Sequence, residues 1–396
     1  MRKGGVVVTG MGVISALGRG VSVTRERLYE GYVQPAPEKG PLECSLSPRP
    51  AVFYVEALPA GNGDGLLTRT SRLALEAVGE AFRQAFGDCF DVDLNRVGVC
   101  LGTTVGCAFR GERLLRRIDA GGRLCNTEVD EYLKNDLATV VGTAVNARGP
   151  RATVSNACAS GTDAIGVAAQ WIGSGRCDVT IAGGADELDR YPYLGFFSLK
   201  NMALERCRPF DRRRAGLNLG EGAGILILEA EEHARERGAR IVGRVLGYGA
   251  GADAYHLTAP HPRGIGIRRA IGSALAEARL EVVDIAFANA HGTATTENDV
   301  VEGRVFRDLF GSEFPFISTK GSTGHTLGAA GAIEAVFCLI NLSDRCIGPS
   351  AGFEQFDPEC GIAPVDRTLA ICGRAALSTS LAFGGAASAL VLGAGE

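Results

Sequence analysis

Three short segments place a reactive side chain at a turn between an apolar stretch and a stretch rich in small residues. Cys158 stands in VSNACASGTDAIG, His291 in NAHGTAT and His325 in GSTGHTLGAAG. A thiol and imidazoles are the groups that nucleophilic and general acid–base catalysis use most often. Because glycines at such turns allow a substrate to come close, we expect the three side chains to share one site.

Cys158 follows an apolar stretch that reads as a strand, and a helix is expected to open over residues 159–162. The positive end of a helix dipole favours a thiolate and lowers its pKa. A fall from about 8.5 to about 7 would ionise about half of the thiol at pH 7. Backbone N–H groups at the same turn are suited to hold an oxyanion. Taken alone, such a residue is more often a buried structural cysteine at a tight turn.

Two further charged residues lie near His325. Lys320 ends an apolar strand in ISTKGSTGH, and Glu334 is the single charge in the apolar stretch AAGAIEAV. A buried acid needs a partner, and Lys320 is the candidate for Glu334. Lys320 is also placed to orient a histidine. The alternative interpretation is that Lys320 is a surface residue with a buried aliphatic stem.

Phe383 in STSLAFGGAASALVL is followed by Gly384 and Gly385 between two apolar runs. An aromatic ring beside two glycines in a hairpin-like turn is typical of a mobile plug over a pocket. The alternative is an ordinary core aromatic.

The elements that must position these residues repeat one unit, in which a β-branched strand leads through a turn into a helix. This pattern predicts an α/β protein with helices packed on mostly parallel strands. A weak internal echo predicts two similar halves joined near residue 250. The segment from 31 to 66 is rich in Pro and Gly and reads as a surface loop. The predicted strands span 6–10, 97–104, 151–157, 179–185, 224–230, 286–293 and 315–322.

Composition narrows the class of protein. The chain has 396 residues, of which 55 are Gly, with 46% hydrophobic and 22% charged residues, as in a folded globular protein. A net charge of −4 argues against a dedicated nucleic-acid binder. The sequence has no run of about 18 apolar residues, so no membrane span is predicted. The 12 Cys form no C-x-x-C pair, which indicates a reducing, cytosolic setting without a metal site.

Over nearly its whole length, the chain resembles the β-ketoacyl-(acyl carrier protein) synthases, the elongating condensing enzymes of the thiolase superfamily. The resemblance rests on VVVTGMGVISALG, GPRATVSNACASG, CRPFDRRRAGLNLGEGAG, NAHGTAT, STKGSTGHTLGAAGAIE and AFGG. It implies a five-layered α-β-α-β-α fold built from two similar halves. The half over residues 1–250 would carry the nucleophile, and the half over 251–396 would carry both active-site histidines.

The resemblance also implies a role for each matching residue. The nucleophile matches Cys158, and the two active-site histidines match His291 and His325. The motif lysine, the helix glutamate, the gating phenylalanine and a pocket-lining aliphatic residue match Lys320, Glu334, Phe383 and Val105.

The implied reaction is a decarboxylative Claisen condensation. Cys158 would take an acyl chain as a thioester, and the two histidines would donate hydrogen bonds to the thioester carbonyl of malonyl-carrier protein as CO2 leaves. Backbone N–H groups of Cys158 and Phe383 would hold the second oxyanion. No cofactor is implied. The implied partners are acyl- and malonyl-loaded acyl carrier protein and a second subunit, in a homodimer or a heterodimer, with no nucleic acid and no membrane span.

Departures from the family pattern concern the substrate. AFGGAA replaces the usual G-F-G-G-T-N, and AGLNLG replaces a DGFVLG-type run, which suggests a specialised ketosynthase. A degradative thiolase would need a second Cys near its C-terminus, and a non-catalytic chain-length partner usually lacks the nucleophile. Because the carrier protein is acidic, we expect a basic docking patch. Its candidate residues are Arg69, Arg72, Arg113, Arg116, Arg117, Lys200 and Arg206.

Overall fold

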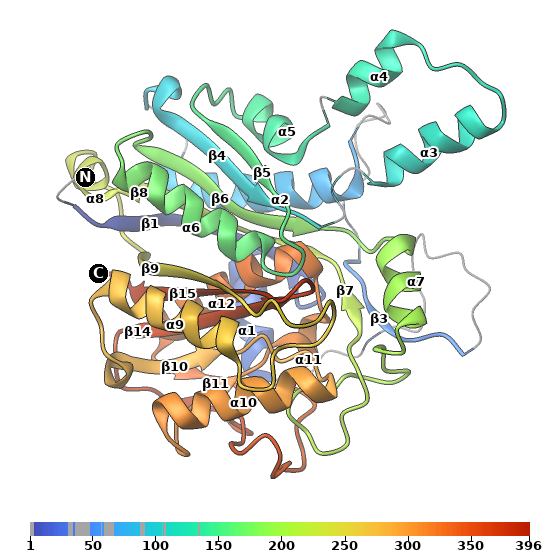
Figure 1. The fold of residues 1–396 in the computed structure, drawn as a ribbon. Helices are drawn as coiled ribbons and strands as arrows, with labels where there is room; N and C mark the ends of the chain where they lie inside the picture. The colour runs from blue at the N-terminus through green and yellow to red at the C-terminus, as the bar shows by residue number, and fades with distance from the viewer. Residues whose placement is uncertain are drawn as a thin grey trace.

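The computed structural model describes residues 4–30, 35, 48–56, 58, 67–87, 92–104, 106, 108–133 and 135–396. Most of its strands form one extended sheet in two parts (Figure 1), and β3 with β7 and β12 with β13 form two small separate sheets. The first part has the order β8-β6-β4-β5 beside β1, and the second has the order β11-β10-β14-β15-β9. These strands are β1 (Val6–Ser15), β4 (Val97–Gly102), β5 (Arg151–Val154), β6 (Val179–Asp186), β8 (Gly222–Ala230), β9 (Gly243–Ala252), β10 (Ile285–Asn289), β11 (Phe316–Ile317), β14 (Ala375–Ala382) and β15 (Ala386–Ala394).

The two parts of the sheet meet where β1 pairs with β9 over a short antiparallel stretch, with Val6 opposite Val245 and Val8 opposite Gly243. Helices lie outside and between the two parts (Figure 1). The helices of these layers are α2 (Arg69–Phe86), α5 (Leu137–Ala144), α6 (Ser160–Gly173), α9 (Ile265–Ala278), α10 (Thr296–Phe310) and α12 (Ala330–Asp344). Shorter or peripheral elements are α1 (Val21–Glu30), α3 (Ala108–Asp119), α4 (Asn126–Leu133), α7 (Arg190–Ser198), α8 (Glu231–Glu236), α11 (Lys320–Thr323), β2 (Gly18–Arg19), β3 (Val52–Phe53), β7 (Leu219–Gly220), β12 (Cys346–Ile347) and β13 (Leu369–Ala370).

Strand alternation explains the layers. In β8, Leu226 and Leu228 belong to the central core around α6 and α12, whereas Ile225 and Ile227 belong to the outer core under α2. In the same way, Leu390 of β15 belongs to the central core, whereas Ala389 and Val391 belong to the core under α9. Strands β8 and β15 are therefore buried on both faces, as their continuous apolar sequences require. The predicted α/β class and five layers are confirmed.

Two details of the expected fold are wrong. The sheet is mixed: β4 and β10 have parallel neighbours, but β14 and β15 form an antiparallel pair, because a tight turn joins them directly. The Pro- and Gly-rich segment is not wholly surface loop either. Within its described residues Val52 and Phe53 form β3, which pairs with β7 and is buried.

One segment in the described residues, Leu327–Asp344, is long and apolar enough to cross a membrane, and it consists of α12 with the turn before it. Of this segment, 89% is buried inside the protein. Its apolar character is that of the helix at the centre of the fold.

A glycine on α6 allows the close approach of this helix to the turn before α12. A Cβ at Gly161 would lie 2.7 Å from the carbonyl oxygen of Gly328 and 3.0 Å from the Cβ of Ala332. We expect Gly161→Ala to lower the free energy of unfolding by about 1–3 kcal/mol, as overpacking does. Gly173→Ala, on the same helix with nothing nearby, should leave it unchanged or raise it by about 0.5–1 kcal/mol. Urea denaturation of both variants tests this, and equal effects would contradict it.

Candidate functional site

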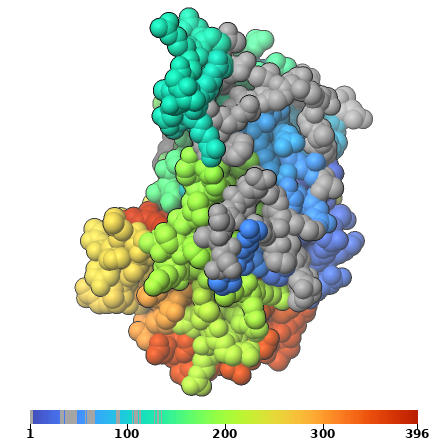
Figure 2. Space-filling model, turned by 90° about the vertical axis from the view of Figure 1, so that its right-hand side faces the viewer, coloured from blue at the N-terminus to red at the C-terminus, as the bar shows by residue number. Residues whose placement is uncertain are grey.

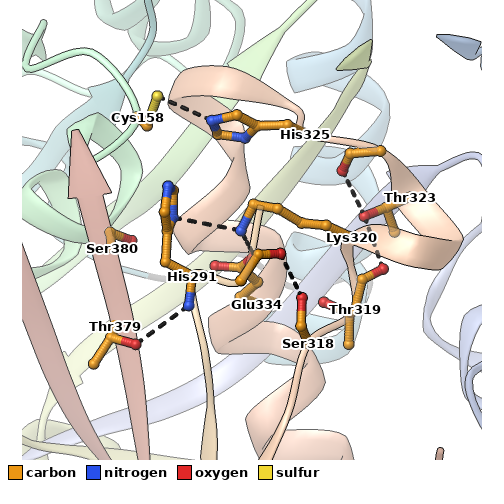
Figure 3. Close-up of polar contacts among 12 residues, drawn as sticks. Cys158, His291, Ser318, Thr319, Lys320, Thr323, His325, Glu334, Thr379 and Ser380 are labelled. Carbon is orange, nitrogen blue, oxygen red and sulfur yellow. Dashed lines mark hydrogen bonds and ion pairs between the residues drawn. The ribbon is translucent and has the colours of Figure 1, made fainter. Parts of the chain in front are cut away.

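Three segments from both parts of the sheet bring the side chains of Cys158, His291 and His325 together (Figure 3), and a fourth segment places Phe383 at the same cavity. Cys158 lies in the turn between β5 and α6, and His291 follows β10. His325 follows α11, and Phe383 occupies the turn between β14 and β15. The Cys158 Sγ lies 3.0 Å from Nε2 of His325. The two imidazole rings stand edge to face with their centroids 5.2 Å apart.

The turn at Cys158 is a strained strand-to-helix elbow. Ala157 has a φ of 44°, in the left-handed region that non-glycine residues rarely adopt. The Ser160 hydroxyl fixes the turn, since it accepts from the Asn156 N–H (2.8 Å) and donates to the Ala157 carbonyl (2.6 Å). Such a turn presents a nucleophile at the head of a helix.

The thiol at this elbow does not have the lowered pKa expected from the helix terminus. Burial raises the pKa of Cys158 to about 12, and the nearby Asp186 carboxylate adds to the rise. The charge of Lys320 and the backbone N–H groups of Cys158 and Phe383 act in the opposite direction but do not outweigh burial. The sulfur therefore rests as a thiol, and it needs a base to take its proton as it attacks.

Alkylation of Cys158 tests this pKa. With a pKa near 12, the thiolate fraction rises about tenfold for each pH unit between 7 and 9. We expect the rate of iodoacetamide labelling at Cys158, followed by peptide mass mapping, to rise in the same proportion. The exposed Cys125 and Cys372 serve as internal references for an accessible thiol. A labelling rate at Cys158 that levels off near pH 7 would show the depressed pKa instead.

The tautomer of His291 follows from its neighbour. Nδ1 of His291 lies 3.5 Å from Nζ of Lys320. A lysine ammonium can only donate, so Nδ1 accepts and the ring proton sits on Nε2. Burial and the charge of Lys320 hold the pKa of His291 well below its usual value. His291 is thus a neutral imidazole with an Nε2–H ready to donate.

His325 is held by its backbone. Its N–H donates to the Asn218 carbonyl (2.8 Å), and its carbonyl accepts from the Gly220 N–H (3.0 Å). Burial is the larger cause and the charge of Lys320 the smaller one that together hold the pKa of His325 well below its usual value. This ring is neutral as well, and its Nε2 faces the sulfur.

Lys320 and Glu334 form a buried ion pair behind the two histidines. Lys320 is 1% exposed and Glu334 is 2% exposed, so each buried charge is compensated by the other. Burial raises the pKa of Glu334 to about 7, against the lowering effect of Lys320.

A further buried acid supports His291, and the sequence reasoning missed it. The two carboxylate oxygens of Glu302, on α10, accept from the N–H groups of His291 and Gly292, each at 2.8 Å. Thr379 donates to the same carboxylate at 2.7 Å. An acid on the helix that follows a histidine turn was the available signal, but helical acids are usually solvated.

Phe383 packs against Phe196 on α7, with ring centroids 5.1 Å apart. Both rings line a narrow cavity of about 60 Å³ that also includes Cys158, His291 and His325. A larger cavity of about 810 Å³ lies between α1 and the C-terminus and touches none of these residues. The chemistry-bearing residues favour the narrow cavity as the site. Val105, predicted to line it, lies outside the described residues.

The predicted basic patch is only partly available. Arg69 is 13% exposed at its side chain and is bound by the buried Glu221, at 2.6 and 2.8 Å. Arg206 donates to the carbonyl of Gly321 at 2.8 Å, and Lys200 is exposed. Among the residues that the structure describes, no cluster of three His, Cys, Asp or Glu could hold a metal ion.

The two-part sheet and the central cysteine with two neutral histidines define a thiolase-like condensing protein. Comparisons with known proteins identify the family. Residues 65–234 match the model of the β-ketoacyl synthase N-terminal domain, and residues 242–354 match that of the C-terminal domain. The chain belongs to the β-ketoacyl synthase family, and it is a condensing enzyme of the acyltransferase type.

Individual relatives match this chain over nearly its full length. The chain is 34% identical over 402 residues to a 3-oxoacyl-(acyl-carrier-protein) synthase 2 of Staphylococcus aureus, covering 98% of this chain and 97% of that protein. A solved β-ketoacyl synthase from Burkholderia phymatum has a TM-score of 0.88 at 31% identity and 99% coverage of both chains. A ketosynthase from Xenorhabdus doucetiae, in complex with its chain length factor, has a TM-score of 0.83 at 31% identity, covering 99% and 98%.

Proposed function

We propose that this chain extends acyl groups on Cys158 by decarboxylative condensation with malonyl-loaded acyl carrier protein. The observation that carries the proposal is the buried triad, in which Cys158 Sγ lies 3.0 Å from His325 and neutral His291 stands beside it. The reaction needs one nucleophile and two hydrogen-bond donors in a site that excludes water. The presence of Cys158 favours this role over that of a non-catalytic chain-length partner.

In the first half-reaction, the Cys158 sulfur attacks the thioester of an acyl-carrier protein. His325 enters this step with its ring proton on Nδ1, so Nε2 accepts the thiol proton. The imidazolium then releases its Nδ1 proton to solvent, and the departing pantetheine thiolate takes a proton from solvent, so the carrier leaves as a free thiol and His325 is left as its Nε2–H tautomer. The N–H groups of Cys158 and Phe383, which both act on the sulfur, are the donors we assign to the oxyanion.

In the second half-reaction, the Nε2–H groups of His291 and His325 donate to the thioester carbonyl of the malonyl group. The bond to the carboxylate breaks, CO2 leaves, and its electron pair forms the enolate that the two imidazoles stabilise. The enolate carbon attacks the Cys158 thioester and expels the thiolate, which returns to a thiol with a proton from solvent. Neutral imidazoles suit this role, and both pKa values are lowered in the required direction.

The partners that we propose are acyl carrier protein and a second subunit. One solved relative, at 27% identity, is a type II polyketide ketosynthase in complex with its acyl-carrier protein, and others are paired with a chain length factor. Among the strands that the structure describes, β5 lies at an open edge of the sheet. Helices α3 and α4 extend beyond the rest of the protein (Figure 2). Leu115 and Leu133 on them are 59% and 66% exposed. Exposed apolar side chains and an open sheet edge each favour a protein partner.

We also propose the division into halves at residues 250 and 251, with a cytoplasmic location. The boundary lies within β9, which pairs with both β1 and β15. Cys158 then comes from the first half and both histidines from the second.

A condensation assay tests the function. The protein, alone and with a candidate partner subunit, is given malonyl-carrier protein and a panel of acyl-carrier proteins, and 3-oxoacyl product and CO2 are measured. The expected result is product from a restricted set of acyl groups. Normal elongation of saturated chains from short to long would overturn the specialised role, and no product from any acyl group would overturn the function.

A further inference from the structure

A buried carboxylate under the nucleophile joins the two parts of the sheet. Asp163, in the first turn of α6, is 7% exposed. Its Oδ2 accepts from Asn156 Nδ2 (2.7 Å), and its Oδ1 accepts from the Tyr248 hydroxyl (2.9 Å) and the Ser388 hydroxyl. Asn156 belongs to the turn that carries Cys158, whereas Tyr248 and Ser388 lie on β9 and β15.

On the first side, Asn156 is rigidly coupled to the nucleophile. Its N–H donates to Ser160 Oγ at 2.8 Å, and its carbonyl accepts from the Ala159 N–H at 3.0 Å. The turn from Asn156 to Ser160 therefore moves as one unit with Cys158. A displacement of the Asn156 side chain is passed directly to the sulfur.

On the other side, Ser388 is coupled to Phe383. It stands on β15 opposite Ser380 of β14, and the turn with Phe383 joins these two strands. The Ser380 hydroxyl also contacts Thr162 Oγ1 at 2.8 Å, one residue before Asp163. The Phe383 N–H acts on the Cys158 sulfur from this turn.

Tyr248 completes the connection by close packing. A Cβ at Gly166, one turn along α6, would lie 2.3 Å from the Tyr248 ring, so the ring packs closely against the helix at this glycine. The phenol oxygen is thereby aimed at Asp163. All three partners donate, and therefore both oxygens of Asp163 must accept.

We propose that Asp163 is a positioning residue that sets the distance between the Cys158 sulfur and the Phe383 N–H group. The inference rests on the proposed function, because this N–H matters as a donor to the oxyanion of the acyl thioester. Asp163 touches no reacting atom. It acts through Asn156 on one side and Ser388 on the other.

A side-chain exchange tests the inference. Asn156→Asp places a second acceptor carboxylate against Asp163, and like charges repel. The double variant Asn156→Asp/Asp163→Asn restores one donor facing one acceptor, while the new amide oxygen still accepts from Tyr248 and Ser388. Asp366→Asn, on a surface acid with a side chain 63% exposed, is the matched control.

The readouts are the rate of acyl transfer to Cys158 at saturating acyl-carrier protein, KM, and the thermal midpoint. Small displacements of reacting groups cost about 10²-fold in rate. We expect Asn156→Asp to lower the saturated rate about 10- to 100-fold with KM within a factor of two. The double variant should recover to within about threefold, and the control should match the unmodified protein.

Three outcomes separate the ideas. If the unmodified protein takes up no acyl group, the proposed function fails. If it does, but Asn156→Asp keeps its rate, or the double variant recovers the thermal midpoint without the rate, Asp163 is merely structural. Should Asn156→Asp not fold, the pair Tyr248→Phe/Ser388→Ala removes the donors from the other side. That variant should lose about tenfold in rate at unchanged KM, and an unchanged rate would overturn the inference.

Discussion

Replacing Lys320 by methionine is expected to lower the free energy of unfolding by about 3–5 kcal/mol. The substitution leaves Glu334 buried without its cation, and the Glu334 residue is only 2% exposed. It also removes the group that fixes the Nδ1 acceptor of His291, so condensation should fall about 10²-fold. Urea denaturation and the condensation assay measure the two effects separately.

The stability loss should depend on pH in a set direction. Burial already raises the pKa of Glu334 to about 7, above the unfolded value of about 4.5, and loss of Lys320 raises it further. The folded variant therefore keeps a proton that the unfolded chain releases, and its stability falls as the pH rises from 5 to 8. Lys320→Met should accordingly be less stable at pH 8 than at pH 6, relative to the unmodified protein.

A double variant provides the control for this pair. Lys320→Met/Glu334→Gln removes both charges, so it should regain more than half of the lost stability but not the activity. If Lys320→Met alone costs less than about 1 kcal/mol, the pair does not behave as a buried ion pair.

Replacing His291 by alanine is expected to separate the two half-reactions. Of the two histidines, His325 contacts the sulfur, at 3.0 Å, whereas His291 faces Lys320 through Nδ1. His291→Ala should therefore load an acyl group at close to the normal rate but condense about 10²–10³-fold more slowly, as when one oxyanion donor is removed. His325→Ala should lose both half-reactions.

The pH profile adds a second test of the two histidines. Their pKa values lie well below 6.5 because of burial and Lys320, so lowering the pH from 8 to 6 should not switch off decarboxylation by protonating them. His233→Ala, in the surface helix α8, is the control. A His291→Ala protein that condenses normally, or that fails to load, would contradict the assignment.

Much of the site follows from the sequence because turn chemistry is local. Cys158, His291 and His325 each stand among small residues after an apolar strand, and strand ends converge at a sheet edge. The Lys320–Glu334 contact follows from the rule that a buried charge needs a partner. Glu302 could not be assigned, because its burial depends on β14 and on the His291 turn, which come from other parts of the chain.

The pKa of Cys158 shows most clearly where local reasoning ends. The helix terminus next to it predicts a lowered pKa, but burial of the sulfur raises the pKa of Cys158 to about 12. Long-range packing likewise turned Val52 and Phe53 into a buried strand, although their surroundings read as a loop. The antiparallel pairs of the sheet arise from chain reversals that apolar periodicity does not encode.

The mass of the intact protein after incubation with acyl-carrier proteins tests the central claim most directly. The unmodified chain should gain the mass of one acyl group, which peptide mapping should locate on Cys158. Cys158→Ala should gain none, while Cys338→Ala, which changes a buried cysteine of α12, should still load. Acyl loading of Cys158→Ala, or loading of the unmodified chain at another residue, would contradict the account.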